Sequence, residues 1–240
     1  MKKGIYTILL SVVVGFIGST AIGQQDPQFA QYFDNTLFVN PAYAGSKEVL
    51  NVTAIHREQW VGFNGRPRST TLSIHSPLPY ESIGIGLTAV NDNIGPLNQT
   101  LVYADFSYTL KFKNSKSRLA FGVKGGVNII NGRFTDLETG TADDPKLNQN
   151  VHNKVNPNFG FGVYYHLPKF FVGVSVPKIL ERRYYELSET SIERRHYYGI
   201  IGGVFDIGAK WKIRPSGQVK ITQGVPVNVD LSAAFIYNDK

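Results

Sequence analysis

The sequence predicts an all-β protein, an antiparallel transmembrane β-barrel of the kind found in bacterial outer membranes. Three observations lead to this prediction. The chain begins with a secretory signal, its short segments alternate apolar and polar residues, and the connections between these segments alternate in length. A period of two is typical of strands with two different faces, and alternating loop lengths are typical of membrane barrels.

The N-terminus has the three parts of a secretory signal peptide, which we place at residues 1–23. Lys2 and Lys3 supply a basic start, residues 5–17 form an apolar stretch, and residues 21–23 are small enough for a signal peptidase. Cleavage before Gln24 would lower the formal net charge from +7 to +5. The remaining basic residues are scattered rather than gathered in one stripe, which argues against nucleic-acid binding.

The chain has no cysteine. This excludes a disulfide framework, zinc sites with thiolate ligands, cysteine nucleophiles and a lipid anchor on an N-terminal cysteine. No segment after the signal has 18 consecutive apolar residues. A membrane crossing would therefore have to be made by the strands of a closed barrel, which pairs every backbone group.

Ten strands are expected after an N-terminal segment at residues 24–48, and together they make up a barrel domain at residues 49–240. In the clearest strand, Ile83, Ile85 and Leu87 oppose Gly84 and Thr88. Helical periodicity is missing between the strands, apart from a turn within residues 177–195. The expected bounds are 49–57, 68–76, 82–91, 100–112, 118–130, 157–167, 169–176, 195–209, 210–222 and 227–237.

The composition of the two strand faces favours a membrane barrel over a soluble β-sandwich, which would also alternate. The polar face is rich in glycine and small polar residues, and charged residues such as Asp105 and Lys124 interrupt it, as expected of a barrel lumen. Aromatic residues recur at strand ends, where an aromatic girdle would lie. We expect a charge at lipid-facing Leu87 or Phe121 to cost about 2–4 kcal/mol, and lumen-facing Thr88 or Asn128 to tolerate lysine.

Loop lengths predict the orientation. The first, third, fifth and seventh connections are expected to be long, at residues 58–67, 92–99, 131–156 and 177–194. The second, fourth, sixth and eighth are expected to be short, and only the ninth, at 223–226, departs from this parity. Long loops then face outward, and the N-terminal segment lies in the periplasm. A finished barrel of this type usually ends with a strand that carries a terminal aromatic residue, whereas this chain stops at residues 238–240, just after a strand. We therefore also expect further C-terminal strands in the complete barrel.

Chemical motifs give no support for catalysis. Residues 84–89 match a relaxed dinucleotide fingerprint, but the match lies inside a strand rather than between a strand and a helix. The five histidines lack metal-ligand spacing. Ser73 and His75 share a strand face, yet no acidic partner or oxyanion motif is near them in the sequence. We therefore predict no enzymatic activity, no cofactor and no metal site.

One charged loop contains a candidate contact surface. Arg182 and Arg183 are followed directly by Tyr184 and Tyr185. Arginine and tyrosine dominate binding hot spots, so these residues suit a protein contact. They equally suit a girdle at the membrane surface.

Four blocks of the sequence resemble the PorP/SprF family of Bacteroidetes. They are DPQFAQY at 26–32, VNPAYAGS at 39–46, HREQWVGFNG at 56–65 and GIGLTAVNDNIGP at 84–96. The resemblance implies an outer-membrane component of the type IX secretion and gliding machinery. It implies that the protein helps particular secreted adhesins to leave the cell or to stay attached, and that it associates with periplasmic parts of the system.

The same blocks supply candidate partner-binding residues. From the N-terminal blocks these are Asp26, Phe29, Tyr32, Asn40 and Tyr43, and the third block adds Trp60. The main hypothesis is a non-enzymatic barrel that contacts outer-membrane lipid and binds adhesin cargo or periplasmic secretion proteins. The alternative is a general outer-membrane channel for small solutes, and a barrel enzyme is a more distant option.

Overall fold

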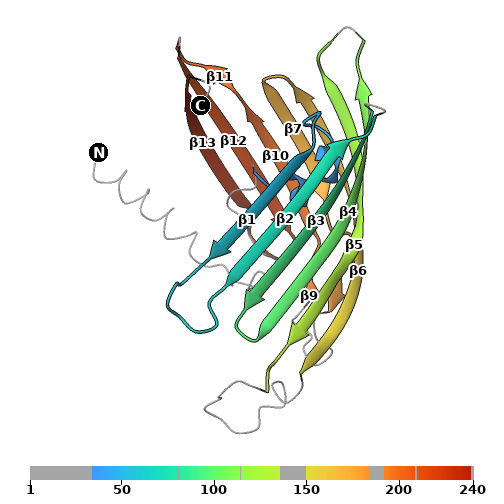
Figure 1. The fold of residues 1–240 in the computed structure, drawn as a ribbon, viewed down its shortest axis with the longest axis vertical. Helices are drawn as coiled ribbons and strands as arrows, with labels where there is room; N and C mark the ends of the chain where they lie inside the picture. Colours follow the sequence, from blue (N-terminus) through green and yellow to red (C-terminus); the bar gives the residue numbers. More distant parts are fainter. Residues whose placement is uncertain are drawn as a thin grey trace, which may run out of the picture.

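A single antiparallel sheet of 11 strands dominates the computed structural model, which describes residues 34–79, 82–113, 115–135, 150–183, 192–208 and 210–238. The sheet curves strongly, so that its strands surround a central space (Figure 1). Each strand pairs with its neighbour in the chain order, up to β7. Within the described residues β1 and β13 are not paired with each other, so the sheet is not closed.

The strands of this sheet are β1 (Asn51–Glu58), β2 (Arg68–Pro77), β3 (Ile83–Ile94), β4 (Leu97–Lys111), β5 (Arg118–Gly132), β6 (Val151–Leu167), β7 (Phe170–Val176), β10 (His196–Gly203), β11 (Phe205–Asp206), β12 (Trp211–Thr222) and β13 (Asn228–Tyr237). A separate pair consists of β8 (Arg182–Arg183) and β9 (Ile192–Glu193). Two short helices precede the sheet, α2 (Thr36–Val39) and the 3-10 helix η1 (Pro41–Tyr43). No described helix is long and apolar enough to cross a membrane.

The predicted all-β, antiparallel architecture is confirmed, and eight of the ten expected strands lie within three residues of their predicted bounds. β6 begins at Val151 rather than at residue 157, and the segment expected at 195–209 divides into β10 and β11. Val204 leaves the ladder between them, and its N–H donates to the carbonyl of Lys169 at 2.9 Å. The pair β8 and β9 also lies in a connection that was expected to hold only a turn.

The predicted length of the third connection is wrong. β3 and β4 continue past the expected ends, and a tight turn at Gly95, whose φ is +56°, joins them. Most residues of the extension are polar, and Asp92 and Gln99 within it face inward and are buried. At its start the Nδ2 of Asn91 donates to the Oγ1 of Thr100 at 2.9 Å. The eighth connection, expected to be almost absent, spans residues 204–210 and includes β11.

Burial along the strands is the reverse of that in a water-soluble protein. Outward-facing Leu87 and Phe121 are 50% and 39% exposed, whereas inward-facing Thr88 and Asn128 are buried. This pattern is expected when the outer face contacts lipid and the inner face is polar. It confirms the predicted faces. The expectation that Thr88 and Asn128 tolerate lysine is wrong, because both positions are packed and sealed from solvent.

The apolar outer surface ends at a defined level on β3 and β4. On β3 the outward residues are apolar from Ile83 to Ala89 and are then replaced by Asn91 and Asn93. On β4 the change occurs between Val102 and Thr100, which lie opposite Ala89 and Asn91. The aligned change marks one boundary of the apolar band on the outer surface, on the side of the odd-numbered connections.

Candidate partner-binding site

The N-terminal segment before β1 lies on the concave face of the sheet. In Figure 1 its two helices, in blue, lie inside the curve of the strands. Asn40 separates α2 from η1, and its side-chain oxygen accepts from the N–H of Ala42 at 3.0 Å. Pro41 is the first residue of η1, where its missing N–H costs nothing. We call residues 34–46 the inner segment.

Asn40 also anchors the inner segment to two strands. Its side chain is fully buried. The Nδ2 group donates to the carbonyl of Val163 on β6 at 3.0 Å and to that of Val174 on β7 at 3.4 Å. Since a buried amide is costly when unpaired, these contacts fix the position of the turn between α2 and η1.

Inward side chains of β2, β4 and β7 hold the backbone of the same segment. The Oγ of Ser107 donates to the carbonyl of Ala44 at 2.7 Å, and the Oγ of Ser175 donates to that of Val39 at 2.9 Å. The N–H of Gly45 donates to the Nδ1 of His75 at 3.1 Å. Backbone groups without partners in secondary structure are thereby satisfied by the lumen wall.

Inward-facing glycines make room for the inner segment. A Cβ at Gly122 would lie 2.1 Å from the nitrogen of Ala42, and one at Gly84 would lie 2.2 Å from the oxygen of Ala44. A Cβ at Gly162 would lie 2.1 Å from the Oδ1 of Asn40. The segment therefore sits in a groove that only glycine permits. The sequence placed Gly84 on the lumen face, but it could not show what the glycine accommodates.

Lys124 on β5 connects the sheet to α2 through hydrogen bonds. Its Nζ donates to the carbonyls of Leu37 and Phe38, both at 3.0 Å, and lies 3.3 Å from Asp105 on the neighbouring strand. The ammonium also lies 5.4 Å from the ring centroid of Tyr103. The buried charge is thus compensated by a carboxylate, two carbonyls and aromatic faces, as a buried ion pair requires.

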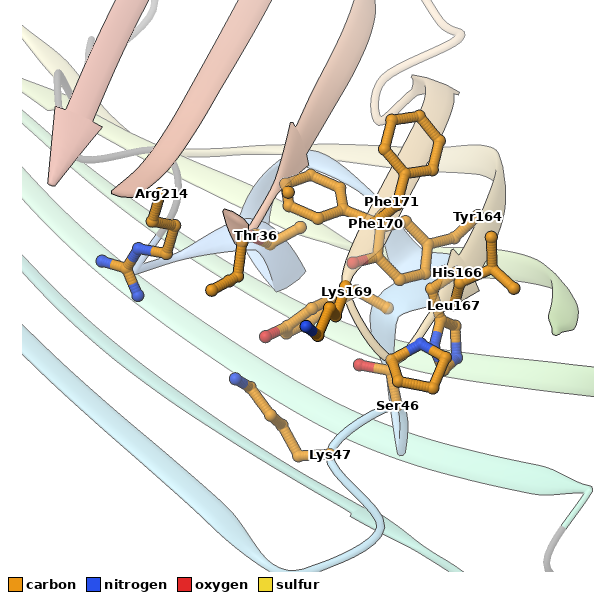
Figure 2. Close-up of a pocket in the computed structure, with 14 residues that line it drawn as sticks. Thr36, Ser46, Lys47, Tyr164, His166, Leu167, Lys169, Phe170, Phe171 and Arg214 are labelled. Carbon is orange, nitrogen blue, oxygen red and sulfur yellow. The ribbon is translucent and has the colours of Figure 1, made fainter. Parts of the chain in front are cut away.

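Two adjoining cavities open where the inner segment ends. They lie at the end of the sheet that carries the even-numbered connections, such as the turn between β6 and β7. The first, about 190 Å³, is shown in Figure 2 with Lys47, Lys169 and Arg214 at its rim. The second is about 310 Å³. Both cavities are lined by Ser46 and His166. No sequence motif predicted this site, since its residues come from segments far apart in the chain.

The residues predicted to bind partners fall into four groups. Asn40 and Tyr43 lie inside the fold, so a partner cannot reach the Asn40 side chain while the segment is seated. Trp60 is 71% exposed in the loop between β1 and β2. Arg182 and Arg183 form β8, opposite Glu193 and Ile192 of β9. Residues outside the described part of the chain are Asp26, Phe29, Tyr32, Tyr184 and Tyr185, together with the predicted signal peptide.

A curved antiparallel sheet with an apolar outer face and a polar inner face, part of which holds the inner segment, is typical of the class of β-barrel membrane proteins. The sequence model of the family described as type IX secretion system membrane protein PorP/SprF matches residues 21–240. The chain therefore belongs to this family, and the resemblance seen in the N-terminal blocks is confirmed. No curated protein and no solved structure matches the chain.

Proposed function

We propose that this protein is an outer-membrane component of the type IX secretion and gliding machinery that helps to secrete or anchor specific surface adhesins by protein–protein binding. One structural observation supports this proposal independently of membership in the family. The inner segment is held in a fitted groove by hydrogen bonds with residues of β2, β4, β6 and β7. A barrel whose interior is occupied in this way is better suited to present binding surfaces than to pass solutes.

The loop between β1 and β2 supports binding on the side of the odd-numbered connections. Trp60, Val61 and Phe63 are each more than two-thirds exposed there. The loop is tied at both ends, because the N–H of Gln59 donates to the carbonyl of Pro67 and that of Gly95 to the carbonyl of Gly65. Exposed aromatic residues on a fixed loop are typical of a contact surface. Together with Arg182 and Arg183, this loop is our proposed site for the adhesin.

The opposite end of the sheet is the proposed site for periplasmic secretion proteins. The inner segment reaches this end at Ser46, next to the two cavities. With cleavage of the predicted signal peptide, the new N-terminus would lie on the periplasmic side. The alternative function, a general channel for small solutes, would require the inner segment to leave its groove.

Deleting the gene and measuring adhesin at the cell surface tests the proposal. We expect surface adhesin to fall, and the wild-type gene to restore it. A Trp60→Ala/Phe63→Ala variant should restore less than the wild type, whereas Asn93→Ala, an outward polar residue on the same side, should restore it fully. Normal adhesin display in the deletion strain, combined with altered solute uptake, would refute the proposal in favour of a channel.

A further inference from the structure

The wall of the sheet has a step where β7 ends. β6 is 17 residues long and β7 only 7, and their last pair on the side of the odd-numbered connections is Phe161 and Val176. Beyond that pair β6 continues back to Val151, whereas the chain after β7 leaves the ladder. Residues 177–181 turn onto the inner face of β6, and β8 follows them directly. We call residues 177–181 the base segment.

Asn158, a buried residue on the inner face of β6, holds the base segment. Its Oδ1 accepts from the N–H groups of Ile179 and Leu180, both at 3.0 Å, and its Nδ2 donates to the carbonyl of Leu180 at 2.8 Å. The N–H of Ile179 also donates to the carbonyl of Phe159 at 2.8 Å. Within the described part of the chain, the N–H of Leu180 therefore depends on Asn158 alone. One asparagine thus satisfies backbone groups that lie outside the β ladders.

Further contacts fix the base segment at both of its ends. At the start, a Cβ at Gly160, the next inward position of β6, would lie 2.3 Å from the carbonyl oxygen of Pro177. At the end, the Nε of Arg195 donates to the carbonyl of Ile179 at 3.0 Å. The backbone N–H of Arg195 donates to the Oε1 of Glu181 at 3.1 Å. Because Arg195 directly precedes β10, the two ends of this connection are joined to each other and to the inner face of β6.

The antiparallel pair β8 and β9 lies between these anchored ends. Arg182 and Arg183 follow the base segment without a break and pair with Glu193 and Ile192. The two arginines belong to the proposed adhesin site. A binding surface that is already held in place has less conformational freedom to lose when its partner binds. The anchor inside the lumen is therefore a means of preparing this surface for binding.

We propose that Asn158 is a positioning residue for the adhesin: it holds the base segment inside the lumen and thereby keeps β8, with Arg182 and Arg183, in place for the partner. The inference rests on the proposed function, because it takes the adhesin as the partner of these arginines. Asn158 is itself buried and acts only through the base segment. Its loss should weaken binding although no contact residue is removed.

Hydrogen exchange of the purified full chain in lipid nanodiscs tests the anchor without any adhesin. The N–H of Leu180 should exchange slowly, and Asn158→Ala should accelerate its exchange about tenfold or more, because the group loses its partner. The N–H of Ile179 should accelerate less, since the carbonyl of Phe159 still accepts from it. Asn158→Asp keeps an acceptor for both groups and should slow the exchange of Leu180 again.

The matched control is Asn156→Ala, at the preceding inward position of β6. The Nδ2 of Asn156 is buried without a hydrogen-bond partner in the described part of the chain. None of the hydrogen bonds that hold the base segment involves this residue. Leu180 should exchange in this variant as in the wild type. Equal acceleration by Asn156→Ala and Asn158→Ala, or rapid exchange of Leu180 in the wild type, would overturn the anchor.

Complementation of the deletion strain tests the positioning role. The variants are compared at equal amounts of folded barrel, measured by the heat-dependent shift in gel migration. Asn158→Ala and Arg182→Ala/Arg183→Ala should each lower surface adhesin about threefold or more, the effect of a lost or poorly ordered contact. Asn158→Asp should restore part of the display, and Asn156→Ala should restore all of it. Normal display with Asn158→Ala or with the double arginine variant would overturn the positioning role.

Combining the substitutions separates positioning from general damage to the barrel. If Asn158 acts through the two arginines, Asn158→Ala should lower surface adhesin no further once Arg182→Ala/Arg183→Ala is present, because coupled residues are not additive. A full additional loss in the triple variant would overturn the positioning role. If the deletion strain displays adhesin normally while Asn158→Ala still accelerates the exchange of Leu180, the proposed function and the positioning role fail together and only the anchor remains.

Discussion

Asp105 on β4 and Lys124 on β5 lie directly opposite each other in register, with carboxylate and ammonium 3.3 Å apart and both side chains sealed from solvent. The same ammonium donates to the carbonyls of Leu37 and Phe38. One lysine therefore joins neighbouring strands to each other and the sheet to the inner segment. Its position makes the stability of the sheet and the seating of the segment depend on each other.

Removing one member of this ion pair should be far more damaging than removing both. Lys124→Met leaves Asp105 buried without a counter-charge, and we expect a loss of about 3–5 kcal/mol in the free energy of unfolding. Asp105→Leu/Lys124→Met should recover much of that loss, because no buried charge remains. Urea unfolding in lipid vesicles, followed by tryptophan fluorescence, measures both. A double variant that is less stable than Lys124→Met would contradict this account of the pair.

The glycine groove predicts that an added methyl group lowers stability at one position on β5 and has little effect at another. Gly122→Ala places a methyl group against the backbone of Ala42, and overpacking of this kind costs about 1–3 kcal/mol. Gly125→Ala is the matched control, since nothing lies within 4 Å of a Cβ there. The chain has no cysteine, so a Leu37→Cys reporter measures exposure of the inner segment by maleimide labelling. Labelling should accelerate with Gly122→Ala only, and equal rates in both backgrounds would contradict the groove.

The boundary of the apolar band predicts a depth effect on the outer face of β3. Leu87→Lys should cost about 2–4 kcal/mol, because the ammonium would enter the hydrocarbon region. Asn91→Lys, on the same face but beyond the boundary, should cost about 0–1 kcal/mol. Unfolding in vesicles gives both values. Similar costs at the two positions would show that the band does not end between them.

Asn40 should tolerate no change in its hydrogen-bonding character. Asn40→Asp keeps the shape of the side chain but turns a donor toward the carbonyls of Val163 and Val174 into an acceptor. We expect a loss of about 1–3 kcal/mol and faster labelling of the Leu37→Cys reporter. Wild-type stability and labelling in this variant would show that the two contacts do not hold the segment.

Strands and their faces were predictable where the outward residues are apolar. On β3 and β5 each second residue from Ile85 and from Leu119 is apolar, and this period carried the prediction of both strands. The prediction failed where the strands pass beyond the apolar band. Asn91, Asn93 and Thr100 are polar on the outward face there, and Asp92 and Gln99 are polar on the inward face. The apolar period therefore stops although the strands do not.

The inner segment and the cavities were not predictable, because both depend on contacts between distant parts of the chain. Asn40 reaches strands more than 120 residues away. The cavity cations Lys47 and Arg214 are separated by most of the sheet in sequence. Asn40 and Tyr43 were selected from the resemblance as partner contacts, and the structure shows that they also pack and bond within the fold. Their contact with a periplasmic partner stays a prediction.

Conductance in planar lipid bilayers tests most directly the central claim, that the interior is filled and the protein acts by binding rather than as a channel. The wild-type full chain, inserted from detergent, should show no large steady conductance. Gly122→Ala, which loosens the inner segment, should open more often than Gly125→Ala. A large and steady pore in the wild-type protein would contradict the account.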